Sequence, residues 1–191
     1  MRACAAVAAA VVGAIGCGGG QRQDASDGGG RYVVDVERAQ FPARQRIAQR
    51  SSFVITIRNA GHATIPNLAV TLRGFTRRAS NSRDANASVS LWTIDQPPPG
   101  SQTAIEDTWD AGALRPGRRA TLRWRVTPIV AGTHALSYSI APSLLGSARA
   151  QLAGGGVPRS TLTVKVDAKP AIARVDPRTG RVVRDEYQRA K

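Results

Sequence analysis

The chain has too few cysteines for a disulfide scaffold. It contains two, Cys4 and Cys17, and Cys4 lies within an apolar N-terminal stretch that we expect to be removed. The thiol of Cys17 then has no partner for a disulfide. The folded part of the chain must therefore hold itself together by packing and hydrogen bonding alone.

Residues that carry catalysis and metal binding are also scarce. The chain has two histidines, and its single methionine is Met1, so a copper site built from Cys, His and Met is excluded. No Ser/His/Asp motif or usable cysteine nucleophile is present. The acids Glu106, Asp107 and Asp110 could form a calcium site or the active site of a glycosidase, although carboxylates in a loop are more often solvated. We expect a non-catalytic protein with no cofactor and no metal.

Long apolar runs are absent as well. The longest, from Ala3 to Ile15, has about thirteen residues, whereas a membrane-spanning helix needs about twenty. It follows Arg2 and ends in Ala14-Ile15-Gly16-Cys17. This pattern predicts that residues 1–16 are an export signal, and it resembles the signal peptides of bacterial lipoproteins.

That resemblance implies a lipidated, membrane-anchored protein. In such lipoproteins the cysteine thiol takes a diacylglyceryl group and becomes the first residue of the mature chain, which places Cys17 at a membrane of the cell envelope, outside the cytoplasm. An ordinary secretory peptidase also accepts small residues at the spacing of Ala14 and Gly16, and lipoprotein signals more often carry Leu where this chain has Ala14. Cleavage without lipidation, giving a freely diffusing secreted domain, is therefore the alternative.

Residues 17–30 join this cysteine to the rest of the chain. After Cys17 they are mostly glycine and small polar residues, which can bury no apolar area. A chain of this composition and length spans about 20 Å. The segment is expected to be a flexible tether that holds a domain clear of lipid headgroups.

Residues 31–167 are enough for one domain with a substantial core. Apolar and polar residues alternate along several short segments, which is typical of strands with one buried and one solvated face. No segment shows the helical period over ten or more residues. The sequence predicts an all-β protein built as a two-sheet antiparallel sandwich. The predicted strands lie at residues 52–58, 68–73, 121–127, 134–140 and 161–166.

Two of the turns carry a family resemblance. Phe53–Gly61 ends in an Asn-x-Gly turn, and Leu114–Gly117 is a Leu-x-Pro-Gly turn before a long strand. With the flanking strands, they resemble bacterial cell-surface immunoglobulin-like domains of the conserved-repeat and adhesion-related type. The resemblance covers about residues 32–167 and implies an immunoglobulin-like fold, which hosts many unrelated functions. This chain departs from the family in having a single copy and an insertion at residues 77–102.

The insertion begins with a polar stretch from Arg77 that reads as a loop. It then contains an expected edge strand, Ser88–Asp95, with Val89, Leu91 and Thr93 opposed to Trp92 and Ile94. Long loops on a rigid sandwich often carry binding. Trp92 is therefore either a cover for one end of the core or a contact for a partner protein.

The other two tryptophans differ in how clearly the sequence places them. Trp124 falls on the inward face of its predicted strand and is expected in the core, whereas Trp109 is ambiguous.

Residues 168–191 form a basic C-terminal tail. Within it, Asp176-Pro177-Arg178-Thr179-Gly180 supplies proline and glycine where a turn needs them, which predicts a small hairpin. Because an isolated hairpin is marginal in water, the tail either docks on the domain or awaits a partner.

Acidic residues are few relative to basic ones. There are 13 Asp and Glu against 27 Lys and Arg, and removal of Arg2 with the signal leaves a net charge of +13. Because exported proteins rarely meet nucleic acid, the expected partners are anionic headgroups or acidic wall polymers. The first candidate patch is Arg118, Arg119, Arg123 and Arg125, with a merely solvated sheet face as the alternative.

Together these features predict a lipid-anchored, extracytoplasmic immunoglobulin-like domain that acts as a non-catalytic binding or assembly module of the envelope. One alternative is a structural spacer with no ligand of its own. The other is a domain that binds an anionic wall or lipid polymer through its arginine-rich face.

Overall fold

A computed structural model describes residues 29–79, 87–99, 103, 105–144 and 147–184. Within these ranges the secondary structure is strands, turns and bends, with no helix. Among the described residues there is consequently no helix long and apolar enough to cross a membrane. The expected signal peptide, Cys17 and nearly all of the tether lie outside the described residues.

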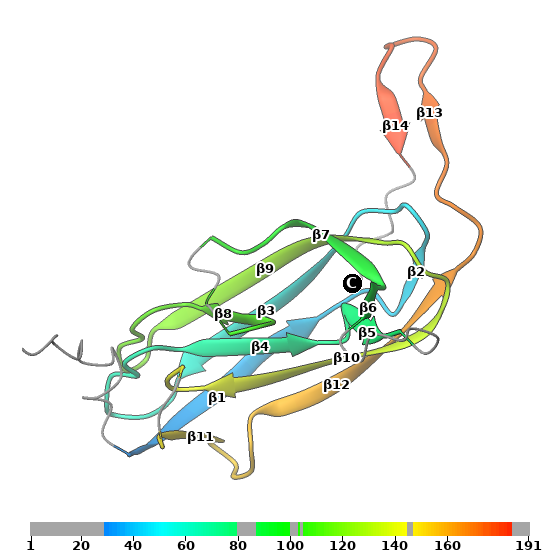
Figure 1. The fold of residues 1–191 in the computed structure, drawn as a ribbon. Coiled ribbons are helices and arrows are strands. Elements are labelled where there is room, and N and C mark those ends of the chain that lie inside the picture. Colours follow the sequence, from blue (N-terminus) through cyan, green and yellow to red (C-terminus); the bar gives the residue numbers. More distant parts are fainter. Residues whose placement is uncertain (1–28, 80–86, 100–102, 104, 145–146, 185–191) are drawn as a thin grey trace, which may run out of the picture.

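Two five-stranded sheets form the body of the domain, one packed over the other (Figure 1). We call the sheet with strand order β11-β1-β3-β9-β7 sheet A, and β3 is its central strand. Its strands are β1 (Arg31–Gln40), β3 (Ser51–Asn59), β7 (Trp92–Gln96), β9 (Arg119–Pro128) and β11 (Arg149–Leu152).

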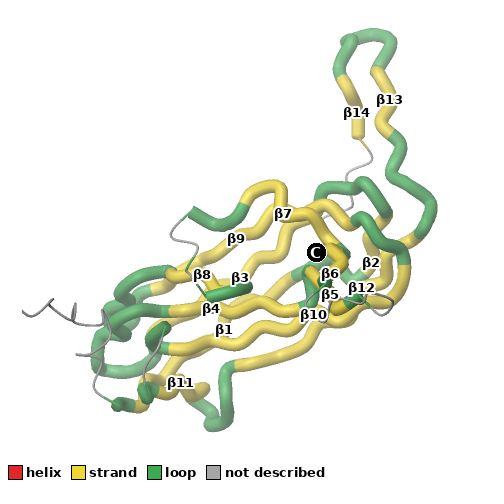
Figure 2. The backbone as a smooth tube through the Cα atoms, in the orientation of Figure 1, coloured by secondary structure: helices red, strands yellow, loops and turns green. Residues whose placement is uncertain are grey.

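Sheet B has the order β2-β12-β10-β4-β8, and two small hairpins complete the structure (Figure 2). The strands of sheet B are β2 (Arg44–Arg46), β4 (Ala69–Arg73), β8 (Thr108–Asp110), β10 (Gly132–Ala141) and β12 (Arg159–Asp167). The hairpins pair β5 (Thr76–Arg78) with β6 (Ser88–Ser90), and β13 (Ala173–Val175) with β14 (Val182–Arg184).

The predicted immunoglobulin-like β-sandwich is confirmed, and each of the five predicted strands corresponds to β3, β4, β9, β10 or β12. Two edge pairs differ from a purely antiparallel arrangement, because β1 pairs with β11, and β2 with β12, in parallel. The first strand leaves sheet A at Phe41-Pro42-Ala43 and continues as β2 in sheet B. This change of sheet lets one segment contribute a strand to both layers.

Inward-facing side chains of β3 and β9 build the core. Phe53 and Trp124 are cross-strand partners with no exposed surface, and their ring centroids lie 5.4 Å apart. Trp109 of β8 packs edge-on against Trp124 from sheet B at 5.3 Å. The expectation for Trp124 is confirmed, and Trp109, which the sequence leaves ambiguous, is also in the core with 3% exposed.

The prediction of one edge strand over Ser88–Asp95 is wrong in detail. A bend at Leu91 splits the segment into β6 and β7, so Leu91 and Trp92 are both buried instead of pointing to opposite faces. Only β7 joins sheet A, at its edge beside β9. Arg77 and Arg78 lie in β5 and not in a loop, while residues 80–86 are outside the described residues.

A buried amide joins the two sheets at the start of β3. Gln45 of β2 has no exposed surface. Its Oε1 accepts hydrogen bonds from the indole Nε1 of Trp92 at 2.9 Å and from the hydroxyl of Ser51 at 3.1 Å, while its Nε2 donates to the carbonyl of Pro42 at 3.0 Å. One side chain thereby ties the sheet-switching segment to β3 and β7.

A second buried amide fixes the other end of β3. Asn59, which is 1% exposed, donates from Nδ2 to the carbonyls of Ala63 at 2.9 Å and Leu114 at 2.7 Å. Its Oδ1 accepts from the backbone N–H of Gly61 at 3.0 Å. The side-chain amide of Asn59 therefore closes the expected Asn-x-Gly turn and also binds the loop before β9.

Replacement of Gln45 by Ala should lower the free energy of unfolding by about 2–4 kcal/mol. The change removes buried atoms and leaves the Trp92 indole N–H and the Ser51 hydroxyl without their acceptor. Denaturant unfolding followed by tryptophan fluorescence measures this. Thr163→Ala, on the exposed face of β12, is the control and should cost less than about 0.5 kcal/mol. Equal stability of the two variants would contradict the role of Gln45.

Candidate functional site

Three of the four candidate arginines lie on one strand and one face. Because Leu122, Trp124 and Val126 point into the core, the alternation of β9 turns Arg119, Arg123 and Arg125 outward, where all three are exposed. We call these three residues the arginine face. Arg118 precedes β9, in a turn closed by its N–H donating to the carbonyl of Arg115. It is exposed but lies outside this outward row.

One end of the arginine face is compensated by acids on β1. The Nε of Arg119 donates to Oε2 of Glu37 at 2.7 Å. Between them on β3, Arg58 pairs with Asp35 and lies 3.4 Å from Glu37. The hydrogen bond from Arg119 lowers the pKa of Glu37 below its ordinary value. Arg119 is therefore a partner in an internal network and not a fully available cation.

The other end carries charge that no carboxylate matches. Among the described residues, neither Arg123 nor Arg125 has an ion-pair partner. Arg123 lies opposite Val54 of β3, and Arg125 opposite Ser52. A carboxylate at the neighbouring edge, Asp95, accepts a hydrogen bond from Thr127 at 2.7 Å. The available positive charge of the face is thus concentrated at Arg123 and Arg125.

Val54 is an apolar residue on the outward row of β3, as the sequence indicates, yet only 4% of it is exposed. Its partners in register are Gln40 on one side and Arg123 on the other. Long side chains at such positions cover an apolar neighbour with their stems while their polar ends stay in water. Arg123 is therefore the cross-strand neighbour of a small apolar residue.

Trp92 does not offer a surface for a partner. Its side chain is 2% exposed, it donates to Gln45, and it packs against Phe41, Phe75 and His134. The candidate partner contact at Trp92 is therefore corrected, because burial leaves no indole face for a second protein. The core-covering interpretation is the one that agrees with these contacts.

The other side chains that could take part in catalysis or metal binding do not come together in one site. His62 is exposed, and the Nε2 of His134 lies 3.0 Å from the carbonyl of Val130. Asp110 is used in a turn, where it accepts from the N–H of Gly112. Burial raises the pKa of Asp107. No group of three His, Cys, Asp or Glu side chains among the described residues is arranged to hold a metal ion.

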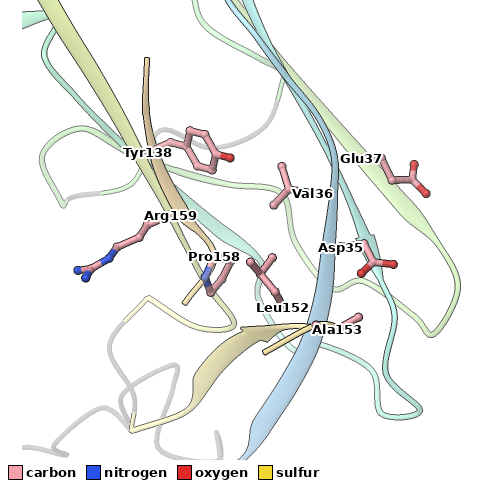
Figure 3. A pocket seen from close by; sticks show the side chains of 9 residues that line it. Asp35, Val36, Glu37, Tyr138, Leu152, Ala153, Pro158 and Arg159 are labelled. Atoms are coloured by element: carbon pink, nitrogen blue, oxygen red, sulfur yellow. The ribbon is translucent and has the colours of Figure 1, made fainter. Parts of the chain in front are cut away.

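A cavity of about 480 Å³ opens where β1 and β11 meet the start of β12 (Figure 3). Val36, Leu152 and Pro158 form its apolar part together with Tyr138, whose pKa is raised by burial. Figure 3 shows that Asp35 and Glu37 project from the opposite side of β1. Both residues also line the cavity, while their carboxylates pair with Arg58 and Arg119.

Comparison with known proteins gives a likeness of fold only. No protein-family model matches the chain, and no curated protein matches it. The CARDB domain of the PF1109 protein from Pyrococcus furiosus, solved in complex with di-metal ions, is 12% identical, with 72% of this chain and 94% of that one covered and a TM-score of 0.43.

Segments of larger proteins are similar to the same extent. A part of Escherichia coli alpha-2-macroglobulin, from domain MG7 to the C-terminus, is 14% identical, with 78% of this chain and 21% of that one covered and a TM-score of 0.46. Red sea bream transglutaminase is also 14% identical, over 72% of this chain and 15% of that one, with a TM-score of 0.39. This chain thus spans less than a quarter of either of these structures.

The acids on β1 are charge-pairing residues that the sequence did not indicate. Val34 and Val36 alternate with Asp35 and Glu37, which is a strand signal of two repeats. The pattern then breaks at a bulge between Val36 and Arg38. Without β1 there was no basis for expecting Arg119 to be neutralised.

Replacement of Arg119 by Gln should raise the pKa of Glu37 toward its ordinary value, because the charged hydrogen bond that favours the carboxylate is lost. In the wild type, the stabilisation from this pair is present at neutral pH and is lost as the pH falls through the folded-state pKa of Glu37. A carboxyl-carbon NMR titration measures the change. Arg123→Gln is the control, and an equal pKa of Glu37 in R119Q and wild type would contradict the pairing.

Proposed function

We propose that the chain is a non-catalytic binding or assembly module of the cell envelope, held on the extracytoplasmic side by a diacylglyceryl group on Cys17. The signal-like residues 1–16 and the cysteine that follows them support the location and the anchor. The β-sandwich supports a binding role at the surface, because packed side chains fill its interior.

The observation that carries the binding role is the unmatched pair Arg123 and Arg125. Both are exposed on the ten-residue strand β9, where Arg125 is paired with β3 and β7 and Arg123 is paired with β3. Outward residues two apart on a strand are separated by about 7 Å. The pair therefore presents two cations at a fixed spacing and favours a ligand with repeated anionic groups.

This observation favours an anionic wall or lipid polymer as the ligand of the arginine face. Guanidinium groups bind phosphate and carboxylate oxygens through paired hydrogen bonds. Each exposed cation contributes about 1 kcal/mol at most, and salt screens the interaction. A spacer without a ligand would show no such binding.

The anchor is tested by the intact mass of the membrane-extracted protein, compared between wild type and Cys17→Ser. We expect the wild type to begin at residue 17 and to carry the added mass of a diacylglyceryl group. The variant should lack this mass and leave the membrane fraction. An unmodified mature wild-type chain in the medium would show instead that the domain is secreted and unanchored.

The arginine face is tested with poly(glycerol phosphate) as the anionic probe. The double variant R123Q/R125Q should bind it about five- to tenfold more weakly than wild type, and the affinity of the wild type should fall as salt is added. Titration calorimetry or fluorescence anisotropy measures both.

A matched control removes the same charge elsewhere. Arg44 and Arg159 are exposed on sheet B, so R44Q/R159Q lowers the net charge equally while leaving β9 intact. We expect this control to weaken binding less than twofold. Equal losses in the two double variants would mean that binding depends only on net charge, and no binding by the wild type would favour the spacer.

A further inference from the structure

The hairpin of β13 and β14 projects from the sandwich (Figure 1, Figure 2). It is closed by its own turn, in which Oδ1 of Asp176 accepts from the N–H of Arg178 at 2.8 Å and of Thr179 at 3.2 Å. The N–H of Gly180, at a φ of 64°, donates to the carbonyl of Asp176 at 2.9 Å. The hairpin expected from the sequence is therefore present and is closed by hydrogen bonds within its own turn.

Its aliphatic side chains are exposed on both faces. Val175 and Val182 are cross-strand partners on one face, with 61% and 58% of each exposed. Val183 pairs with Arg174 on the opposite face and is 37% exposed, and Ile172 just before β13 is 62% exposed. A flat protein surface could cover only one of these faces, whereas the headgroup region of a bilayer surrounds an inserted hairpin.

The charges of the hairpin complement an anionic surface. Arg174, Arg178 and Arg181 are exposed and have no ion-pair partner among the described residues. The acid between them, Asp176, already accepts two backbone hydrogen bonds in the turn. Arginine next to exposed valine is the combination that binds phosphate headgroups while placing aliphatic groups at the acyl boundary.

The hairpin lies at the end of the sandwich opposite to the start of β1 (Figure 1). It follows β12, whose last residues pair with β2, whereas the tether leads into the start of β1. Because β1 continues in the same direction into β2, the start of β1 and the end of β12 are separated by about the length of a ten-residue strand, about 30 Å. Figure 1 shows the start of β1, in blue, at the far end from the hairpin.

We infer that the β13–β14 hairpin is a second binding element, which inserts Val175 and Val182 into the headgroup region of an anionic bilayer while its arginines bind phosphate groups. The surface it contacts faces the end of the domain away from the start of β1. This inference does not require a lipid on Cys17, because the valines and arginines that carry it belong to the hairpin.

The test uses donor vesicles of phosphatidylcholine that carry the full mature protein at residue 17. The protein is attached through its own lipid or, if the thiol is free, through a maleimide lipid. Fluorescent acceptor vesicles contain 30% phosphatidylglycerol in phosphatidylcholine, or phosphatidylcholine alone. We expect wild type to recruit only the anionic acceptors, and both V175S/V182S and R178Q/R181Q to reduce recruitment at least fivefold.

Control variants separate this element from the arginine face. Val157→Ser changes a valine that is 61% exposed on the sandwich and should leave recruitment unchanged, as should R44Q/R159Q. The valine variant is decisive, because binding through β9 needs no valine. If V175S/V182S recruits anionic acceptor vesicles as well as wild type does, the inference is overturned. Failure of wild type to recruit these vesicles would also overturn it, and would favour a protein as the partner of the hairpin. Tryptophan fluorescence verifies that each variant keeps its core.

Discussion

The position of β3 is the constraint on which the rest of the domain depends. β3 is the central strand of sheet A, and a buried amide fixes each of its ends, Gln45 at Ser51 and Asn59 at the turn that follows. A buried amide that loses its partners costs free energy, so each of these amides favours one arrangement of the chain around it. The domain lacks a disulfide pair, and these amides supply the specific links between segments that a disulfide would otherwise provide.

A fixed β3 also decides where charge is available. Its register with β1 places Arg58 opposite Asp35, and its register with β9 places Arg58 opposite Arg119. The bulge in β1 then brings Glu37 within reach of both arginines. Acids therefore compensate one end of the arginine face and leave Arg123 and Arg125 at the other. A slip of one residue in β3 would bury these charges or move them to the wrong neighbours.

Edge strands show how the same fold limits unwanted pairing. β2, β8 and β11 have three or four residues each, and β7 carries a bulge between Ile94 and Gln96. Short and bulged edges are poor templates for another strand. The projecting β13–β14 hairpin, with its exposed valines, contrasts with these protected edges, and this contrast is why we assign it a binding role rather than a structural one.

The sequence predicts what depends on local period and turn chemistry. Five alternating strands, the inward Trp124 and the Asp-Pro-x-x-Gly hairpin are found because the necessary information lies within a few neighbouring residues. The ten-residue β1 is missed, because a bulge after Val36 interrupts its alternation. The short edge strands are missed because three or four residues do not establish a period. The buried Trp92, beside the bend at Leu91, finds its acceptor at Gln45, which is 47 positions from Trp92. The Arg119–Glu37 pair spans 82 positions and two strand registers, so no local pattern in the sequence could reveal it.

Amide hydrogen exchange along β3 tests this account most directly. If the two buried amides and pairing on both sides hold β3, the amides of Phe53–Ile57 that bond to β1 and β9 should exchange among the slowest in the domain, at the rate set by global unfolding. The amides of β7 and β11 should exchange faster, through local opening. Exchange in the centre of β3 as fast as in these edge strands would contradict the claim that β3 is the fixed element of the domain.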